Sequence, residues 1–328
     1  MILSRAPTRI TLGGGGTDLA SYYSKYGGFL VAGAINKYCT ILASRRFYQD
    51  IRLSYSKTEL KKNVGEIEHR IFKAALQITD IQQNIELHST ADVPSGCGLG
   101  TSSSFTVALL NGLHAYKRDF ITHHQLAEEA CHIEIDILGE PIGKQDQYMA
   151  AFGGISCLTF EKNGNVIIEP LRVEPQVYDQ LESNLILFFT GVERSASEIL
   201  KDQDVKSKID DVDMANNLHH IKEIGMETRK YLEKGQVDML GDLFHQHWET
   251  KRKRSSNISN PLIDEYYEIA RKHGALGGKL IGAGGGGFMM FYCKNGEKHK
   301  VIEALQKVGL SWERFHFDFD GAKIMINT

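Results

Sequence analysis

The chain is poor in the residues that mark several large classes of protein. It has five cysteines, an odd number, and no pair of them has the spacing of a zinc knuckle or a redox motif. It has only six prolines and no low-complexity stretch, which excludes a flexible polymer. No apolar run approaches the roughly 20 residues of a membrane span, and charges interrupt the start where a secretory signal would be apolar. We therefore expect a cytoplasmic protein that does not act on a membrane.

An excess of one sign of charge is also lacking. The sequence has 38 Lys and Arg residues against 41 Asp and Glu residues. This balance argues against dedicated binding to nucleic acid or to an anionic membrane, but it permits a local basic site for a small phosphorylated ligand. The hydrophobic share of 42% is ordinary, so the chain can bury a large core. Its 328 residues predict two domains at roughly 150 residues each, and we place them at 1–180 and 181–328.

Apolar spacing predicts a first half that mixes strands with helices and a second half rich in helices. In the first half we expect helices over 19–26, 105–116 and 126–137 and strands over 29–47, 51–55, 84–89, 155–160 and 166–173. In the second half we expect helices between 195 and 275 and over 298–308, and strands over 185–190, 279–281, 288–293 and the alternating 315–319 run. Strands on both sides of a helical stretch are typical of an α+β domain with helices on one face of an antiparallel sheet.

Glycine is the one residue in clear excess, with 32 of 328 residues against a usual share of about 7%. The excess falls in three clusters, Gly13–Gly16, Gly96–Gly100 and Gly282–Gly287. Glycine lets the backbone come close to another group, so clusters in a folded chain mark sites of close approach.

The middle cluster lies between an expected strand and an expected helix. A helix N-terminus offers unpaired N–H groups and a partial positive charge, and glycine lets phosphate oxygens come near. The alternative is a tight turn with a hydroxyl cap, but a cap needs one hydroxyl and this loop has four in a row. The expected phosphate contacts are Pro94, Ser95, Gly96, Gly98, Leu99, Gly100, Thr101, Ser102 and Ser103.

The two outer clusters are more ambiguous. Gly282, Gly284 and Gly287 satisfy G-x-G-x-x-G, but a strand-like run follows where the dinucleotide fingerprint requires a helix, so a Rossmann site is excluded. A structural hairpin and a wall against a ligand both remain open for this loop. The first cluster is followed by Thr17 and Asp18, and Asp18 either bonds sugar hydroxyls or caps the next helix. No G-x-x-x-x-G-K-[ST] loop is present.

Two carboxylates are expected among apolar side chains. The helical neighbours of Glu134 at three and four positions on either side are all apolar, and Asp146 repeats the pattern. A buried carboxylate is costly unless it is paired or bound to metal. The alternative is a pair of helix-border carboxylates tied to Lys or Arg, but the hydroxyl run just upstream favours a metal ligand and a base.

The histidines and one basic run complete the candidates. Neighbouring histidines, as in His219-His220 and His245-x-His247, diverge on a helix, so we expect them at the surface. The run Lys251–Arg254 either binds an anion, with Arg252 and Arg254 as contacts and His247 and Trp248 one turn earlier, or is a solvated helix end.

Three glycine clusters in this order, with two carboxylates between the second and third, resemble the GHMP kinases. The resemblance spans Pro7 to Gly287. The Gly-Gly-Gly-Thr-Asp form of the first cluster and the stretch Gly274–Phe288 are most similar to those of kinases that phosphorylate D-glycero-D-manno-heptose 7-phosphate for nucleotide-heptose synthesis. The family's fold implies an N-terminal mixed α/β domain and a ferredoxin-like α+β C-terminal domain, with the active site in the cleft between them.

The resemblance also implies a cofactor set and roles for individual residues. ATP would lie on the middle loop, with Ser102 and Glu134 holding Mg²⁺. Asp146 would take the proton from the attacking hydroxyl, and Arg9 would keep Asp146 ionised and offset charge on the transferred group. The substrate, a small phosphosugar, would contact Gly15, Gly16, Thr17, Asp18, Lys144, Gly284, Gly285, Gly286, Arg252 and Arg254. We expect a monomer or a homodimer.

Three departures from the family pattern bear on these roles. Gly15-Gly16 stands where galactokinases have Glu-His, which weakens a galactose assignment. Ser103 follows Ser102 where the family has alanine, so the metal hydroxyl is open to displacement by one position, and Lys144 contacts either a phosphate or solvent. The runner-up is a kinase of an unphosphorylated sugar such as fucose or galactose. A non-catalytic sugar and ATP sensor is a third hypothesis, but it would need none of the catalytic groups intact.

Overall fold

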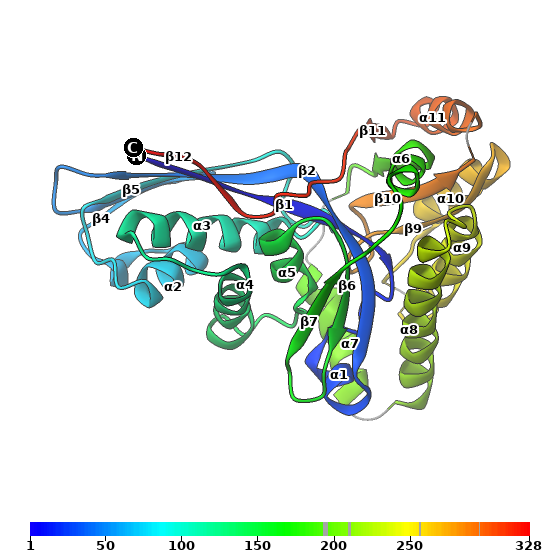
Figure 1. Cartoon of the computed structure of the whole chain (residues 1–328), viewed down its shortest axis with the longest axis horizontal. Helices are drawn as coiled ribbons and strands as arrows, with labels where there is room; N and C mark the ends of the chain where they lie inside the picture. Colours follow the sequence, from blue (N-terminus) through cyan, green and yellow to red (C-terminus); the bar gives the residue numbers. More distant parts are fainter. Residues whose placement is uncertain (193–195, 209–210, 256, 295) are drawn as a thin grey trace.

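Two long antiparallel strands are the frame of the first half (Figure 1). The structure, a computed structural model, describes residues 1–192, 196–208, 211–255, 257–294 and 296–328. β1 (Ile2–Gly13) pairs with β2 (Gly28–Arg45) along nearly its whole length, and β2 runs unbroken because its β-branched and aromatic residues continue without a turn signal. The sheet has the order β12-β1-β2-β5-β3-β4, with β6 and β7 branching from β2. The remaining strands are β3 (Ile51–Ser54), β4 (Thr58–Lys61), β5 (Ile85–Ala91), β6 (Ile155–Phe160), β7 (Val166–Pro170) and β12 (Lys323–Asn327).

Helices cover one face of this sheet and enclose the first core (Figure 1). They are α2 (Arg70–Ile78), α3 (Thr101–Lys117), α4 (His123–Cys131) and α5 (Gln145–Phe152). α3 lies against β1 and β2, and its Leu109, Leu110 and Leu113 are fully buried. The helix expected over 126–137 is divided, because α4 passes at its end into a π-helix, η2 (His132–Ile137). Single π turns inside helices are frequent at functional sites.

The second half has its own four-stranded antiparallel sheet, with the order β11-β8-β10-β9. Its strands are β8 (Leu185–Phe189), β9 (Ala275–Leu280), β10 (Phe288–Cys293) and β11 (Ser311–Glu313). α9 (Met239–Lys251) packs against β9 and β10, and α8 (Val212–Glu233) also reaches β1 and β2 of the first sheet. The other described helices of this half are α6 (Pro175–Asn184), α7 (Ala196–Lys208), α10 (Pro261–Lys272) and α11 (Lys298–Lys307). Two short helices of the first half are α1 (Ala20–Tyr26) and η1 (Val64–Glu66).

The end of the chain differs from the sequence prediction. Residues 315–319 do not form the expected strand, and only Phe317 makes an isolated bridge, to Ile35. The alternation has another cause: Phe315 and Phe317 are buried in the core between the two sheets while the segment crosses from one sheet to the other. β12 then pairs with β1, so the last strand belongs to the first sheet, and the two termini lie side by side (Figure 1). The division of the chain into two domains at residue 180 stays a prediction. β12 follows that residue in the sequence but pairs with β1 of the first sheet.

None of the described helices combines the length and the apolar composition that crossing a bilayer requires.

Candidate active site

A pocket of about 760 Å³ lies between the two halves of the molecule. From the first half it is lined by residues of β1, of the loop before α3, of η2 and of the start of α5. From the second half it is lined by the end of α9 and by the segment that leaves β9. This pocket lies between the two halves, where the site is expected from the sequence.

The loop before α3 has the geometry of an anion site. Gly100, in the left-handed conformation (φ 78°), is the N-cap of α3, and no side chain caps the helix. The first N–H groups of a helix lack intrahelical acceptors. Ser102 and Ser103 of the first turn line the pocket together with Ser95, Gly96 and Gly98. The alternative, a tight turn with a hydroxyl cap, is wrong, since the Oγ1 of Thr101 donates instead to the carbonyl of Pro94 at 3.1 Å.

Ser102 and Glu134 are brought together at the start of α3. The Oγ of Ser102 donates to Oε1 of Glu134 at 2.8 Å, and Nε2 of Gln147 donates to Oε2 at 2.7 Å. Glu134 is only 2% exposed, and burial raises its pKa to about 6. No role for Gln147 is predicted from the sequence. Its position next to Asp146 at the start of α5 is the feature that could have indicated one.

This pair fits a magnesium ion. Mg²⁺ takes oxygen ligands and is usually held by one or two carboxylates together with substrate phosphates. Glu134 supplies a buried carboxylate that accepts hydrogen bonds from the neutral side chains of Ser102 and Gln147, and Oε1 of Gln147 beside it is buried without a hydrogen-bond partner among the described residues. A cation at this point would offset the cost of the buried charge.

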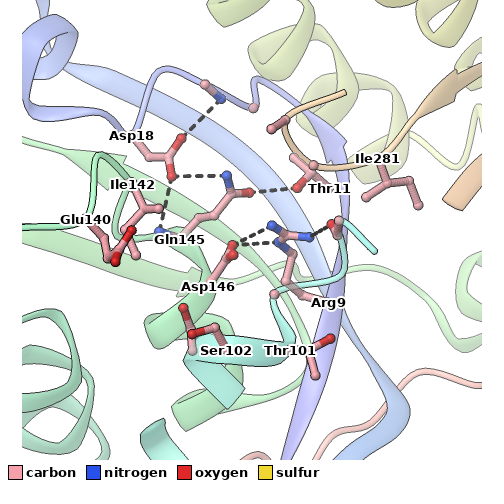
Figure 2. Close-up of a pocket in the computed structure, with 18 of the residues that line it drawn as sticks. Arg9, Thr11, Asp18, Thr101, Ser102, Glu140, Ile142, Gln145, Asp146 and Ile281 are labelled. Carbon is pink, nitrogen blue, oxygen red and sulfur yellow. Dashed lines mark hydrogen bonds and ion pairs between the residues drawn. The ribbon is translucent and has the colours of Figure 1, made fainter. Parts of the chain in front are cut away.

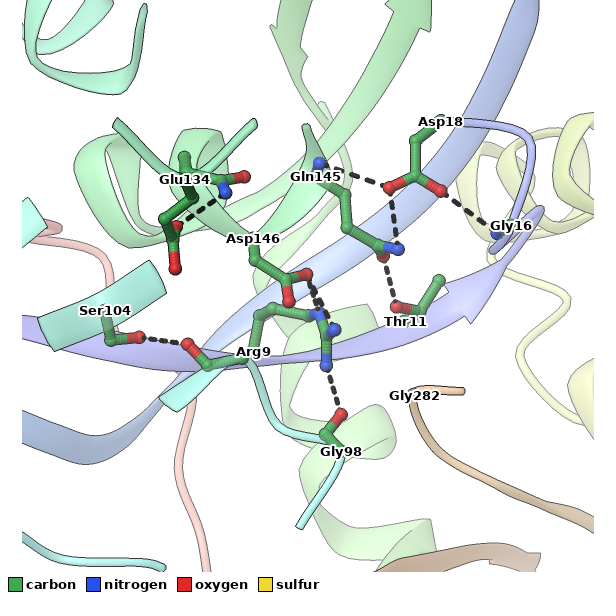
Figure 3. A network of polar contacts seen from close by, with 12 residues as sticks. Arg9, Thr11, Gly16, Asp18, Gly98, Ser104, Glu134, Gln145, Asp146 and Gly282 are labelled. Atoms are coloured by element: carbon green, nitrogen blue, oxygen red, sulfur yellow. Dashed lines mark hydrogen bonds and ion pairs between the residues drawn. The ribbon is translucent and has the colours of Figure 1, made fainter. Parts of the chain in front are cut away.

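Arg9 joins Asp146 to the loop before α3 (Figures 2 and 3). Its Nε and Nη2 lie 2.7 and 2.6 Å from Oδ1 of Asp146, and its Nη1 donates to the carbonyl of Gly98 at 2.5 Å. The backbone N–H of Arg9 also donates to the carbonyl of Leu99 at 2.9 Å. The guanidinium is nearly buried whereas Asp146 keeps 22% exposure toward the pocket. One arginine thus holds a carboxylate and the glycine loop in a fixed relation.

Asp18 is linked to the residue next to Asp146. Its Oδ2 accepts hydrogen bonds from the backbone N–H and from Nε2 of Gln145, at 3.3 and 3.0 Å, and its Oδ1 accepts from the N–H of Gly16. Thr11 donates to the side chain of Gln145 at 2.7 Å. Burial, followed by the charge of Asp146, raises the pKa of Asp18. Asp18 lines the pocket and does not cap α1, whose N-cap is Leu19 without a side-chain bond.

A basic group occupies the second-half side of the pocket. Lys251, Arg254, Lys279 and His247 all line it, and each is less than 9% exposed. The expectation that this histidine lies at the surface is therefore wrong. It faces inward because α9 turns that side toward β9.

Several expected substrate contacts lie elsewhere. Arg252 is bound to Glu249 and Asp264 outside the pocket, because successive residues of a helix point about 100° apart. Lys144 contacts Glu128 and the carbonyl of Gly164. The described residues that line the pocket do not include six other expected contacts, Pro94, Leu99, Thr17, Gly284, Gly285 and Gly286.

The third glycine cluster packs against the middle one. A Cβ on Gly282 would lie 2.5 Å from Cα of Gly98, and a Cβ on Gly287 would lie 2.1 Å from the carbonyl oxygen of Cys97. The N–H of Phe288 donates to that same carbonyl at 3.1 Å. The cluster is thus a backbone support for the loop before α3, and Gly282 with Ala283 reaches the pocket itself.

Gly282→Ala is expected to be far more damaging than Gly309→Ala. Both glycines have positive φ, so both substitutions carry backbone strain of about 1–2 kcal/mol. Only position 282 adds a collision with backbone, which costs roughly a further 1–3 kcal/mol, whereas nothing lies within 4 Å of a Cβ at 309. Denaturant unfolding and the KM for ATP measure the two effects. Equal losses of stability and an unchanged KM in both variants would contradict the supporting role.

Comparisons with known proteins agree on one family. The descriptions "GHMP kinases N terminal domain" and "GHMP kinases C terminal" match residues 69–154 and 228–310. The chain is 32% identical to the D-glycero-alpha-D-manno-heptose 7-phosphate kinase of Campylobacter jejuni, over 98% of both chains. It is 30% identical over 71% of its length to the bifunctional fucokinase/GDP-fucose pyrophosphorylase of Arabidopsis thaliana, of which it covers 23%. The crystal structure of a D-glycero-D-manno-heptose 1-phosphate kinase from Bacteroides thetaiotaomicron superposes with a TM-score of 0.83 at 27% identity, covering 99% of each chain.

Proposed function

The chain belongs to the GHMP kinase family, and from that premise we propose that it transfers the γ-phosphoryl group of ATP to the anomeric hydroxyl of D-glycero-D-manno-heptose 7-phosphate, giving the 1,7-bisphosphate. The family and the α+β fold expected from the sequence are confirmed by the two domain matches and the solved relative. The protein is therefore an ATP-dependent sugar-phosphate kinase of this family. The particular heptose and the position of transfer are the proposal.

The arrangement of Arg9 is the observation that carries the proposed chemistry. Phosphoryl transfer depends on positioning and on stabilising charge rather than on covalent help from the protein. The guanidinium contacts both Asp146 and the carbonyl of Gly98 in the glycine loop. One cation therefore lies where the sugar hydroxyl, which accepts the phosphoryl group, would meet the γ-phosphate of ATP. Asp146 receives or orients the proton of the attacking hydroxyl, and Arg9 holds its carboxylate in place.

The remaining residues bind and orient the two substrates. The N–H groups at the start of α3, with Ser95 and Gly96, take the ATP phosphates. Ser102 and Glu134 would hold Mg²⁺, which supplies charge neutralisation for the phosphate oxygens when bound. Asp18, oriented by Gln145 and the N–H of Gly16, accepts hydrogen bonds from sugar hydroxyls.

The heptose assignment is supported by the Campylobacter relative, which the chain matches along its whole length. The fucokinase relative supports the runner-up, a kinase of an unphosphorylated sugar, over a shorter part of the chain. A non-catalytic sensor is disfavoured because Arg9, Asp146, Ser102 and Glu134 are all present and lie together in one pocket.

A coupled ADP-release assay with ATP and Mg²⁺ tests the substrate. We expect turnover on D-glycero-D-manno-heptose 7-phosphate to exceed that on sedoheptulose 7-phosphate, mannose 6-phosphate, fucose and galactose. Turnover on a free sugar alone would replace the proposal by the runner-up. Bound ATP without turnover on any sugar would favour the sensor.

A further inference from the structure

The basic group on the second-half side of the pocket is not used by the transfer chemistry described above. It consists of Lys251, Arg254, Lys279 and His247, which we call the basic cluster. Lys251 and Arg254 come from the end of α9 and the turn after it, whereas Lys279 lies on β9. All four side chains are more than nine-tenths buried, yet they line a pocket rather than a packed core. Buried cations are costly unless an anion accompanies them.

Arg254 has a donor left over. Its Nε donates to Asn217 at 3.1 Å and its Nη1 donates to Gln203 at 2.7 Å. Its Nη2 is buried and has no hydrogen-bond partner among the described residues. A buried donor without a partner destabilises the folded state, more so when it is charged, and an acceptor on a bound ligand would remove this cost. A Cβ on Gly16 would lie 2.8 Å from Nη1, which keeps glycine beside the guanidinium.

The two lysines and the histidine are oriented by contacts on their far sides. Nζ of Lys251 donates to the carbonyls of Leu280 and Gly282, at 2.9 and 2.5 Å, which leaves a third N–H. Nζ of Lys279 donates to the carbonyl of Leu12 at 2.9 Å and lies 3.0 Å from Nδ1 of His247. When Lys279 is protonated, as a bound anion favours, its ammonium has no lone pair, so Nδ1 of His247 accepts and Nε2 carries the proton. His247 is thereby set as a neutral donor.

The close packing of buried basic groups in the cluster favours the binding of an anion. Burial, followed by the charges of Arg254 and Arg9, lowers the pKa of Lys251 to about 7. Burial, followed by the charge of Lys251, lowers the pKa of Lys279 well below its usual range. Burial lowers the pKa of Arg254 to about 10, and only Asp18 acts in the opposite direction. A doubly charged phosphate would reverse each of these shifts.

Arg254 marks the end of the cluster away from the point of transfer, whereas Lys251 and Lys279, whose pKa values burial lowers, lie near enough to Arg9 for its charge to lower them further. Asp146 is the chain neighbour of Gln145, whose side chain donates a hydrogen bond to Asp18 (Figure 3). The charge of Asp18 in turn acts on Arg254 and opposes the lowering of its pKa by burial. We propose that Arg254, Lys251 and Lys279, with Nε2 of His247, bind a second phosphate monoester on the acceptor, at the end of the sugar remote from the reacting hydroxyl. This inference rests on the proposed function. It assigns to the basic cluster the selection of a sugar phosphate over a free sugar. Charge-assisted bonds from an arginine fork suit a phosphate geometrically.

The test compares Arg254→Met and Lys251→Met with Lys253→Met, whose side chain is exposed and which is one residue from Arg254 and two from Lys251. Losing a hydrogen bond to a charged group corresponds to roughly a 10- to 100-fold change. We expect KM for the heptose 7-phosphate to rise by that factor in the first two variants, with the KM for ATP within about twofold of wild type. Arg254→Lys should recover part of the loss, and Lys253→Met should match wild type. Thermal unfolding of each variant accompanies the kinetics.

Calorimetric binding of inorganic phosphate to the wild type and to Arg254→Met separates this inference from the proposed function. Phosphate binding that Arg254→Met abolishes supports the site even if no heptose phosphate is turned over. Full turnover of the heptose phosphate with unchanged KM in both variants would overturn the site and leave the function intact. An equal rise in both KM values would also overturn it, since the cluster would then serve the transferred group. If Arg254→Met does not fold, Arg254→Lys and Lys251→Met carry the test.

Discussion

Asp146→Asn is expected to lower kcat by at least ~10²-fold and to leave both KM values near those of the wild type. A general base contributes about 10²- to 10⁴-fold, and asparagine keeps the size and one acceptor oxygen of the side chain while losing its basicity. Arg9 therefore retains a partner at the same place. Substrate binding through the glycine loop and Asp18 does not pass through this carboxylate. The loss is expected in the chemical step, which steady-state kinetics and a single-turnover measurement both report.

The matched control is Asp242→Asn, an exposed aspartate on α9 outside the pocket. It should keep wild-type kcat. Near-wild-type turnover in Asp146→Asn would remove Asp146 from the mechanism. A large rise in both KM values with unchanged kcat would assign it to binding instead.

Glu134→Gln is expected to raise the Mg²⁺ concentration for half-maximal activity by at least about tenfold. The substitution keeps the shape that Ser102 and Gln147 contact but replaces the carboxylate by a neutral amide, a weaker ligand for a hard cation. An activity titration with Mg²⁺ at saturating ATP measures the shift. Glu129→Gln, on α4 and bonded to His114, is the matched control. A titration curve identical to that of the wild type would exclude Glu134 as a ligand.

Stability without metal shows whether this variant is merely misfolded. Burial raises the pKa of Glu134 from 4.5 to about 6, so the folded state favours the protonated carboxyl. The stability that this preference contributes is complete below about pH 4.5 and is lost as the pH rises through about 6. Above that pH the ionised group costs the folded wild type about 2 kcal/mol, which glutamine avoids. In the absence of metal at pH 8, Glu134→Gln should therefore unfold at a higher temperature than the wild type.

Local patterns in the sequence predict most of the fold and the order of the site. β2, α3 and β10 follow from uninterrupted or periodic apolar residues, which packing on one face requires. The three glycine clusters and the carboxylates Glu134 and Asp146 are recognisable because their residue types and order recur in one family. The structure brings Ser102 to Glu134 and Arg9 to Asp146, and the roles assigned to these residues stay predictions.

Contacts between distant segments account for what the sequence did not predict. Lys279 lies within an apolar strand, and nothing local indicates that it meets His247 of α9. The run 251–254 shows only that charge is concentrated there. α9 ends at Lys251, and the turn after it, in which the N–H of Arg254 donates to the carbonyl of Lys251, brings Arg254 to the pocket and leaves Arg252 outside it. Residue spacing does not show where the helix ends, so the sequence alone could not divide this part of the site.

The identity of the phosphorylated position tests the central claim most directly. We would treat D-glycero-D-manno-heptose 7-phosphate with the enzyme, ATP and Mg²⁺ and record the phosphorus and proton NMR spectra of the product. The account predicts a second phosphomonoester whose phosphorus couples to the anomeric proton. A product phosphorylated at any other carbon, or ADP formed without a new sugar phosphate, would contradict it.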